Sequence, residues 1–427
     1  MNADTVFALA SGAGRAAIAI FRISGPDSAS ALTALCGTLP LPRRAVVRAL
    51  RDTNGEVLDR AVVLWLPGPQ SYSGEDSAEL HVHAGRAVMD AVADRLAALG
   101  LRAAEPGEFT RRAFLNGKLD LVSAEAVHDL VAAETDAQRR QALRQLEGAL
   151  GILYRDWSDR LRGALARQEA LIDFPDEDLP PEVEADLLAS VRSLRQEIGV
   201  HLDDRHRGEK LREGLCFAIT GAPNVGKSSL INALAERDVA IVSPTPGTTR
   251  DAIETRIVLG GVPVTLVDTA GLRDTADPIE AEGVRRARAR AAAADLVLTV
   301  VEAGSPTVSE PGSLVVVNKS DLYPERRADV LAISALTGAG LPELRDRLAA
   351  EATALTQSSG PPPLTRARHR TALVAAARWI AEAEDAIEPE LRGEAMRLAL
   401  RALGTITGQV GVEEILDSIF RQFCIGK

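Results

Sequence analysis

The sequence contains little of what marks several classes of protein. Only 3% of its residues are aromatic, so Ala, Leu, Val and Ile must form most of its hydrophobic core. Its three cysteines, Cys36, Cys216 and Cys424, lie far apart without CxxC spacing, which argues against a disulfide framework or a zinc site. No apolar run approaches the ~20 residues of a membrane-spanning helix, and the first residues lack the pattern of an export signal. We therefore expect a cytoplasmic protein that does not bind a membrane.

An excess of basic residues is also absent. The 49 Lys and Arg residues and the 60 Asp and Glu residues give a formal net charge of −11. A protein of this charge does not coat nucleic acid electrostatically, so any contact with RNA must be local or shared with a partner. The length of 427 residues predicts two or three domains.

The N-terminal part, residues 1–118, has the pattern of an α+β domain. Strand patterns occur at 17–23, 61–66 and 78–83, and a helical pattern occurs at 87–99. In the third of these strands polar and apolar residues alternate, which is typical of a half-buried strand.

Helical periodicity follows in residues 119–212. Apolar residues recur at steps of three or four from Leu143 to Leu165, so we expect one long helix that ends near Asp173. A second helix is expected to begin after Pro181 and to continue to about Arg212.

Residues 213–352 alternate strands and helices, which indicates a parallel sheet with crossover helices. Residues 353–365 form a linker that contains Ser, Gly and Pro, and residues 366–427 are helical again. The simplest arrangement is a discontinuous α-helical bundle domain, made of residues 119–212 and 366–427, with an α/β domain inserted into it.

A phosphate-binding loop occupies residues 221–228, whose sequence GAPNVGKS matches GxxxxGKS between a strand and a helix. Its backbone amides and the helix N-terminus favour phosphate binding. Lys227 would contact the β- and γ-phosphates, and Ser228 would bind Mg²⁺. This loop does not by itself distinguish ATP from GTP.

Later motifs make that distinction. A strand ends at the sequence DTAG, in which Asp268 can hold Mg²⁺ through water and the Gly271 amide can contact the γ-phosphate. In the sequence NKSD, Asp321 can accept hydrogen bonds from N1–H and the 2-amino group of guanine, both of which adenine lacks. Ser334 and Ala335 can support the base. The order of these motifs predicts a Ras-like P-loop GTPase domain.

Hydrolysis in this domain requires a substitute for the glutamine of Ras-like enzymes, because Leu272 follows the DTAG motif and cannot hydrogen-bond. Asp274, Asp277, Glu280 and Glu282 are candidate carboxylates. From the residues alone, the simpler interpretation is an acidic first turn of a helix, which the helix dipole favours.

The segment 243–251 stands where switch I is expected, and its Thr249 is the candidate second hydroxyl ligand of Mg²⁺. The Asn224 side-chain carbonyl could coordinate a monovalent cation, and K⁺ there would act electrostatically as an arginine finger does. Asn224 could also serve only to shape the loop. The predicted GTP contacts are Asn224, Val225, Gly226, Lys227, Ser228, Ser229, Ser243, Pro244, Thr245, Pro246, Gly247, Thr248, Thr249, Asp268, Thr269, Ala270, Gly271, Asn318, Lys319, Asp321, Ser334, Ala335 and Leu336.

With these motifs in place, the chain resembles the MnmE (TrmE) family of tRNA-modifying GTPases over essentially its whole length. The resemblance extends outside the GTPase domain to short blocks of sequence: FRISGP at 21–26, SYSGED at 71–76, PGEFT at 106–110, LNGKLD at 115–120, IDFP at 172–175 and FCIGK at 423–427.

The resemblance implies a homodimer formed through an N-terminal domain that binds 5-formyl- or methylene-tetrahydrofolate. It also implies GTPase domains that dimerise in a K⁺-dependent way, and a flavoprotein partner of the MnmG type that forms a heterotetramer and uses FAD and NADH. Together such proteins add an aminomethyl or carboxymethylaminomethyl group at C5 of the wobble uridine, position 34, of certain tRNAs.

Residue matching to the family implies particular site residues. Folate contacts would be Arg22, Glu79, Lys118 and Lys427, and K⁺ contacts would be Asn224, Ser243, Thr245 and Thr248. Ser243 stands where threonine is common in the family. The resemblance also makes Glu280 the catalytic carboxylate, acting through a bridging water, beside Lys227 and Thr249.

Alternative interpretations remain. A ribosome-assembly or regulatory GTPase without modification chemistry would carry an RNA-binding module after the GTPase domain, but only helical patterns follow residue 366. A dynamin-like protein would need an apolar paddle. His81 and His83 could bind metal, face solvent or lie near folate. Cys424 could be a reactive thiol or a small apolar residue.

Overall fold

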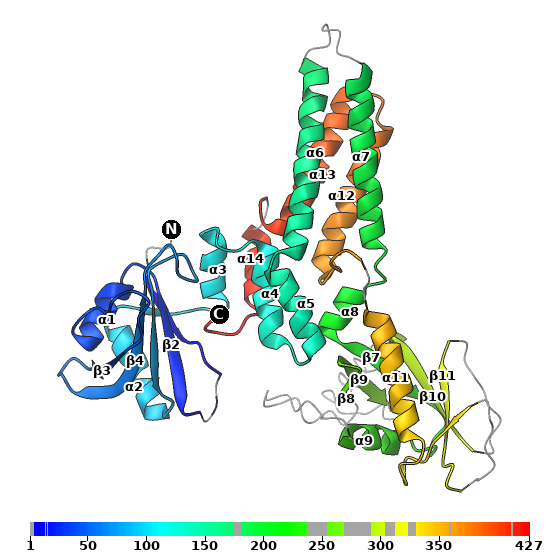
Figure 1. The fold of residues 1–427 in the computed structure, drawn as a ribbon, viewed down its shortest axis with the longest axis horizontal. Helices are drawn as coiled ribbons and strands as arrows, with labels where there is room; N and C mark the ends of the chain where they lie inside the picture. The colour runs from blue at the N-terminus through cyan, green and yellow to red at the C-terminus, as the bar shows by residue number, and fades with distance from the viewer. Residues whose placement is uncertain are drawn as a thin grey trace, which may run out of the picture. The chain divides into compact units, whose positions relative to one another are not determined.

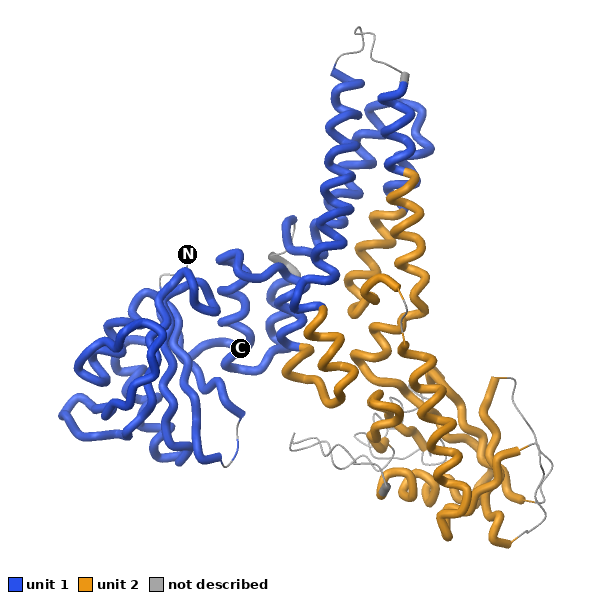
Figure 2. Tube along the Cα trace, in the orientation of Figure 1, with its two compact units in different colours: residues 1–128, 145–191, 378–427 blue, residues 129–144, 192–377 orange. Residues whose placement is uncertain are grey.

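The computed structural model describes residues 4–12, 14, 16–173, 181–237, 254–268, 292–303, 312–322, 330–357, 360–410 and 413–427. They form two compact units (Figure 2). The first contains residues up to 128, 145–191 and 378–427, and the second contains 129–144 and 192–377. The helical segments 129–144 and 192–212 therefore group with the expected GTPase segment.

The first unit contains a six-stranded sheet with the order β3-β4-β5-β2-β1-β6. The strands are β1 Val6–Leu9, β2 Ile18–Ser24, β3 Val46–Arg51, β4 Val57–Leu66, β5 Ser77–His83 and β6 Arg102–Ala103. Neighbours are antiparallel except β1 and β6. The alternation expected for β5 is present, since Ala78, Leu80 and Val82 are buried. The helices α1 Ser28–Cys36 and α2 Arg86–Ala98 contact strands of this sheet (Figure 1).

The remaining helices before the second sheet are α3 Glu108–Leu115, α4 Leu121–Ala132, α5 Asp136–Leu146, α6 Ala149–Asp173, α7 Pro181–Leu202 and α8 Arg207–Glu213. After that sheet come α12 Ala367–Asp385, α13 Pro389–Thr407 and α14 Glu413–Phe420. Helices α6 and α13 lie side by side in the first unit. The buried Gln168 joins them, because its amide donates to the Pro389 carbonyl at 3.0 Å.

Two expected helices are each divided. The single helix expected from Leu143 onward is wrong, because α5 ends at Leu146 and α6 begins at Ala149. Gly148 lies between them with φ +91°, a left-handed conformation that ends a helix. The helix expected to reach Arg212 also ends early, at Leu202, because Arg205 and His206 have φ of +54° and +59°.

The second unit contains the other sheet, with the order β12-β11-β10-β7-β9-β8. Its strands are β7 Leu215–Thr220, β8 Glu254–Leu259, β9 Val262–Asp268, β10 Leu296–Glu302, β11 Leu314–Asn318 and β12 Leu331–Ala332. All pairs are parallel except β8 with β9. The helices α9 Lys227–Arg237 and α11 Leu341–Thr356 complete its apolar core. This is the expected α/β arrangement.

Arg370 joins the segments that lead into and out of this sheet. Its guanidinium donates to the Leu202 carbonyl at 2.8 Å, to Asp204 at 2.6 Å and to Glu209 at 3.2 Å. Asp204 also accepts the Leu364 amide at 3.3 Å, so the two connecting segments lie together. Adjacent ends are the geometry that domain insertion requires. Within the described ranges, no helix has the length and apolar character needed to cross a membrane.

The buried His201 lies next to Leu202 in this junction, and its burial predicts that the folded protein loses stability in acid. His201 is 5% exposed, and burial lowers its pKa to about 4 from the usual 6.5. The unfolded chain therefore takes up a proton at His201 between these values, so stability falls as the pH drops from 6.5 to 4. The full loss is about 3 kcal/mol.

The substitution His201→Gln should remove this contribution. We expect hydrogen exchange in α7 and α12 to accelerate less on going from pH 7 to pH 4.5 than it does in the wild type, after correction for intrinsic exchange rates. Identical acceleration in both proteins would contradict the assignment.

Candidate functional site

The carboxyl ends of three parallel strands meet at one edge of the second sheet. These strands are β7, β9 and β11, and they end at Thr220, Asp268 and Asn318. Ligands of open α/β sheets bind at this edge. The phosphate-loop motif lies directly between β7 and α9, as the sequence predicts.

The two glycines of the phosphate loop have no room for a side chain. Gly221 has φ +140°, and a Cβ there would lie 2.2 Å from the Val300 carbonyl oxygen. Gly226 has φ +94°, and its Cβ would lie 2.3 Å from Asn318 Nδ2. The loop therefore follows the sheet edge closely, with its backbone exposed for a ligand.

Lys227 and Ser228 begin helix α9 directly after this loop. The buried Lys227 ammonium donates to the carbonyls of Gly221 and Ala222, both at 2.8 Å. A cation held inside the loop is placed to neutralise phosphate charge. Ser228 Oγ donates to Asp268 Oδ2 at 2.7 Å. A hydroxyl and a carboxylate from two elements thus meet, and such oxygens are the ligands that Mg²⁺ prefers.

Asn318 connects the phosphate loop to the loop expected to hold the base. The side chain is 2% exposed; its Nδ2 donates to the Val225 carbonyl at 2.8 Å, and its Oδ1 accepts the Ala335 amide at 3.0 Å. Lys319 follows in a left-handed conformation, with φ +64°, and its ammonium pairs with Glu302 at 2.9 Å.

The other described residues of the expected site flank Asn318. Asp321 is exposed, and Leu336 is 88% exposed. Ser334 is buried, and its hydroxyl accepts the Thr337 amide at 3.1 Å. Further expected contacts lie outside the described residues: Ser243, Pro244, Thr245, Pro246, Gly247, Thr248, Thr249, Thr269, Ala270, Gly271 and the catalytic candidate Glu280.

A second site lies on the sheet of the first unit, where Arg22 on β2 is directly opposite Glu79 on β5. The Arg22 guanidinium donates to Glu79 Oε1 at 3.0 Å and 3.3 Å, and His81 Nε2 lies 3.2 Å from Glu79 Oε2. Burial raises the pKa of Glu79, but the hydrogen bonds from Arg22 and His81 outweigh it, so the pKa lies below its usual value. Glu79 is therefore a carboxylate at neutral pH.

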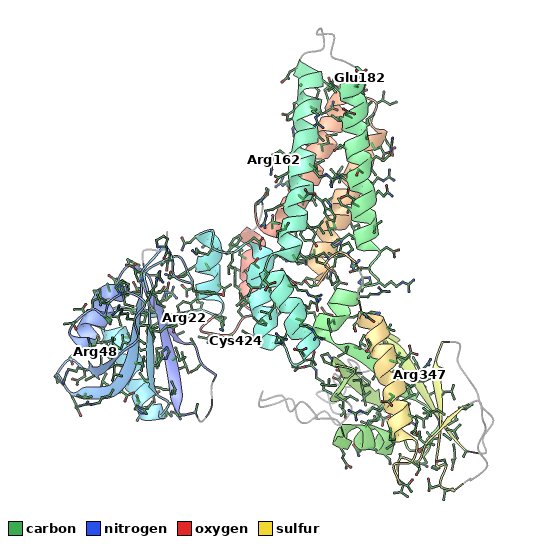
Figure 3. The ribbon with its side chains drawn as sticks, viewed as in Figure 1. Arg22, Arg48, Arg162, Glu182, Arg347 and Cys424 are labelled. Atoms are coloured by element: carbon green, nitrogen blue, oxygen red, sulfur yellow. The ribbon has the colours of Figure 1, made fainter. Side chains whose placement is uncertain are left out.

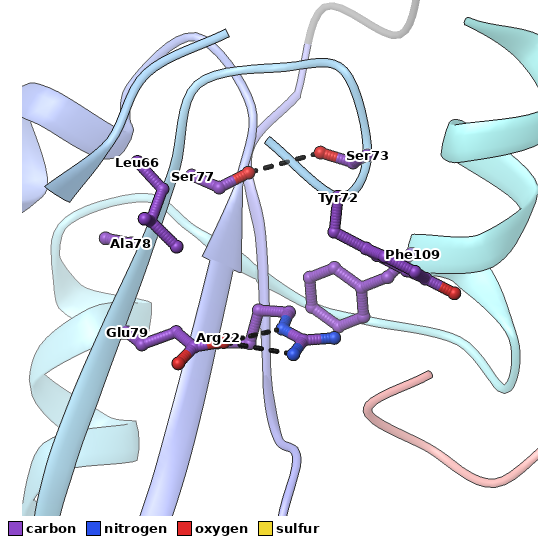
Figure 4. A pocket seen from close by; sticks show the side chains of 8 residues that line it. All are labelled: Arg22, Leu66, Tyr72, Ser73, Ser77, Ala78, Glu79 and Phe109. Carbon is purple, nitrogen blue, oxygen red and sulfur yellow. Dashed lines mark hydrogen bonds and ion pairs between the residues drawn. The ribbon is translucent and has the colours of Figure 1, made fainter. Parts of the chain in front are cut away.

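Two aromatic rings lie near the Arg22 guanidinium (Figure 4). Its guanidinium carbon lies 5.3 Å from the centre of the Tyr72 ring and 5.8 Å from that of Phe109. These residues line a cavity of about 20 Å³, which has room for about one water molecule. Access of a larger group to Glu79 therefore requires Arg22 to move.

Lys118 and the C-terminal segment lie beside this part of the first unit. The Lys118 ammonium donates to the Pro69 carbonyl at 3.0 Å, and the side chain lines an open groove of about 770 Å³. Gly426 packs on β1, since a Cβ there would lie 2.4 Å from the Leu9 carbonyl oxygen. This contact brings Lys427 to the strand next to Arg22. Cys424, labelled in Figure 3, is an exposed free thiol.

His81 and His83 have separate carboxylate partners. His83 Nδ1 lies 2.8 Å from Asp59, whereas His81 contacts Glu79. Among the residues that the structure describes, no group of three or more His, Cys, Asp or Glu side chains is arranged to hold a metal ion.

Sequence reasoning did not single out Tyr72, Phe109 or Arg112. The two aromatic residues lie in the blocks 71–76 and 106–110, which resemble the family. The resemblance of these blocks does not by itself show which of their residues lie at the site. Arg112, only 2% exposed, donates to Asp4 and Glu75 at 2.9 Å and 3.0 Å and thereby holds the loop that carries Tyr72. No sequence pattern connects these distant positions.

Comparisons with known proteins cover the whole chain. The family model described as the GTP-binding protein TrmE N-terminus matches residues 5–118, and the MnmE helical domain model matches residues 121–424. A tRNA modification GTPase MnmE from Granulibacter bethesdensis is 57% identical over 100% of both chains. A protein with the same description from Gluconacetobacter diazotrophicus is 60% identical over 99% of this chain and 98% of its own. One from Rhodospirillum rubrum is 54% identical over 100% of both chains.

Among solved structures, the G domain of the FeoB iron transporter from T. maritima is 24% identical over 34% of this chain and 99% of that chain. Its TM-score is 0.23, which is too low to establish a shared fold.

The contact between Gly226 and Asn318 predicts a matched pair of variants. Gly226→Ala and Gly261→Ala both place a side chain at positive φ, but only the first meets a neighbouring atom within 4 Å. Both should lose about 1 kcal/mol of stability from backbone strain. Only Gly226→Ala should also weaken binding of fluorescent GTP, by more than about tenfold, because Asn318 must leave its partners. Equal GTP affinity in the two variants would contradict this prediction.

Proposed function

Because this chain belongs to the MnmE family of tRNA modification GTPases, we propose that it hydrolyses GTP in a K⁺-dependent way and modifies C5 of the wobble uridine of certain tRNAs. The modification uses a one-carbon tetrahydrofolate and a flavin-dependent partner. The proposal is supported by two features of one chain. At the edge of the second sheet, Lys227 and Asn318 both contact the phosphate loop, and on the first sheet Arg22 pairs with Glu79.

Within this proposal, residues 213–352 are the inserted GTPase domain. Lys227 neutralises the β- and γ-phosphates, and the Asp321 carboxylate accepts the guanine N1–H and 2-amino groups. Ser228 and Asp268 hold Mg²⁺, with Thr249 as a further ligand. When bound, Mg²⁺ neutralises the charge that develops on the phosphates. The short contact between Ser228 and Asp268 supports this assignment.

Catalysis does not use a Ras-type glutamine, because Leu272 has no polar group. Glu280 orients the attacking water through a second water molecule. The K⁺ contacts are Asn224, Ser243, Thr245 and Thr248. For Asn224, support comes from its exposed side chain at φ +62°, which makes no hydrogen bond to any described residue. Its carbonyl oxygen is therefore available to a cation at the phosphates.

The folate is bound by Arg22, Glu79, Lys118 and Lys427. The Glu79 carboxylate reads the amide N–H and 2-amino edge of the pterin, which resembles that of guanine. Arg22 leaves its place beside the two rings when the pterin enters, and Lys118 and Lys427 attract the folate carboxylates. Lys118 also lines a separate open groove of about 770 Å³ in the same unit.

The assembly is a homodimer that joins a flavoprotein of the MnmG type, which contributes FAD and NADH, and acts on tRNA. Nucleoside analysis of tRNA from cells that lack this gene tests the function. We expect the modified wobble uridine to disappear and the gene to restore it. Wobble uridines that stay fully modified without the gene would contradict the proposed function.

The potassium mechanism predicts a salt effect that depends on Asn224. Wild-type GTP turnover should be at least about tenfold faster in KCl than in NaCl. Asn224→Gly removes the side-chain carbonyl but permits the positive φ, so its turnover should be slow and equal in both salts. Equal wild-type rates in KCl and NaCl would exclude this mechanism and leave the GTPase assignment intact.

The folate assignment predicts that Glu79→Gln weakens binding of 5-formyl-tetrahydrofolate on the order of 100-fold, because a donor replaces one of the two acceptors. Calorimetric titration measures the affinity. His83→Gln is the matched control, since it lies on the same strand with a 72% exposed side chain and should bind normally. An unchanged dissociation constant for Glu79→Gln would show that Glu79 does not read the pterin.

A further inference from the structure

A run of sequence in the first unit carries positive charge without compensation. Residues 28–51 include Arg43, Arg44, Arg48 and Arg51 but no Asp or Glu, although the whole chain contains 60 acidic residues among 427. The net charge of −11 therefore conceals a basic segment.

These arginines lie along the free edge of the first sheet. Strand β3 is the terminal strand in the sheet order, and Figure 3 labels Arg48 on it. Arg43 lies in a turn three residues before this strand, and its amide donates to the Trp65 carbonyl at 2.8 Å. Arg60 lies on the neighbouring strand β4, opposite Ala49. We call these five residues, Arg43, Arg44, Arg48, Arg51 and Arg60, the β3 arginine edge; all are exposed except the half-buried Arg48.

No carboxylate among the described residues forms an ion pair with the β3 arginine edge. Arg43 donates to the carbonyls of Pro67 and Gln70 at 3.4 Å and 3.2 Å, and Arg51 donates to that of Gly55 at 2.7 Å. Arg48 donates to the Val47 carbonyl at 3.3 Å. The five guanidinium groups thus have no direct carboxylate partner among the described residues, and residues 43–60 keep a net positive charge, with five arginines against three carboxylates.

Of the three carboxylates in residues 43–60, Glu56 is exposed and forms no ion pair with a described residue, and the other two bind other groups. Asp59 accepts hydrogen bonds from His83, and Asp52 accepts the backbone amides of Asn54 and Glu56. Arginines elsewhere on the surface differ, since Arg139 and Arg140 both pair with Asp136 at 2.6 Å.

The dimensions of this edge select its ligand. Strand β3 alone, from Val46 to Arg51, extends over about 17 Å at roughly 3.3 Å per residue, which is longer than a single phosphate group. One or two charges suffice to prevent edge-to-edge pairing of sheets. Because Arg60 is opposite Ala49, it points to the other face of the sheet from Arg48, so the edge presents guanidinium groups on both faces. A phosphate backbone that passes along the edge meets both, and arginine can bind each phosphate through two hydrogen bonds.

We propose that the β3 arginine edge binds the phosphate backbone of the substrate tRNA. This inference rests on the proposed function, which supplies the RNA. The acidic remainder of the protein repels a polyanion, so the RNA is directed to this edge. Contacts to phosphate position the RNA without reading its sequence, and the edge therefore serves every tRNA substrate alike.

The test is the triple variant R44Q/R51Q/R60Q, with binding of a fluorescent tRNA transcript to the full chain measured by anisotropy at several salt concentrations. We expect affinity near 0.15 M salt to fall on the order of 10- to 100-fold, and the salt dependence to lose roughly one unit of slope per arginine. Binding of 5-formyl-tetrahydrofolate should equal that of the wild type, which verifies folding of the unit that carries the substitutions.

The variant R139Q/R140Q/R347Q is the matched control. It has the same net charge, but its arginines pair with Asp136 and Glu351. Its tRNA affinity should remain within about twofold of the wild type. The proposal is overturned if R44Q/R51Q/R60Q binds tRNA normally, or if both variants lose tRNA affinity equally. It is also overturned if R44Q/R51Q/R60Q keeps its tRNA affinity and loses only the flavoprotein partner in gel filtration.

Nucleoside analysis separates this inference from the proposed function. If the wild-type gene restores wobble modification and R44Q/R51Q/R60Q binds tRNA normally, only the docking surface is wrong. If the wild-type gene fails to restore modification, the proposed function is wrong, and the measured tRNA affinities still decide the docking surface.

Discussion

The side-chain amide of Asn318 joins the loops from which the proposed nucleotide site is built. It donates to Val225 in the phosphate loop and accepts from Ala335 in the loop after β12. Because this amide is buried, breaking either contact leaves a polar group without a partner, which costs about 1–3 kcal/mol. The glycine at position 226 follows from the same contact, since any side chain there would displace Asn318. One side chain thus keeps the phosphate end and the base end of the site in register.

The parallel sheet makes that contact possible. Strands β7, β9 and β11 end at one edge, so residues nearly 100 positions apart meet there. The first unit uses an antiparallel register instead, in which Arg22 and Glu79 are directly opposite. In both sheets, the pairing of the strands brings opposite charges or complementary polar groups together without any ligand. The proposed chemistry, GTP hydrolysis in one unit and folate binding in the other, depends on these two registers.

The sequence was sufficient to predict that the motifs meet at one edge of a parallel sheet, because each motif follows a short apolar strand. It predicted β5 for a similar reason, through strict alternation. It failed at Gly148 and at residues 203–206, where helical periodicity continues across a break in the backbone. The buried Arg112 and the rings around Arg22 could not be found, because their contacts join distant positions without any periodic signal.

Binding of GTP to variants of Asn318 tests this account most directly, with 5-formyl-tetrahydrofolate binding as a control for folding. Asn318→Ala removes both contacts, whereas Asn318→Asp keeps the acceptor for Ala335 and removes the donor to Val225. We predict that GTP affinity falls at least about 100-fold for the alanine variant and by an intermediate factor for the aspartate variant, with unchanged folate affinity. GTP affinity equal to that of the wild type in both variants would contradict the account.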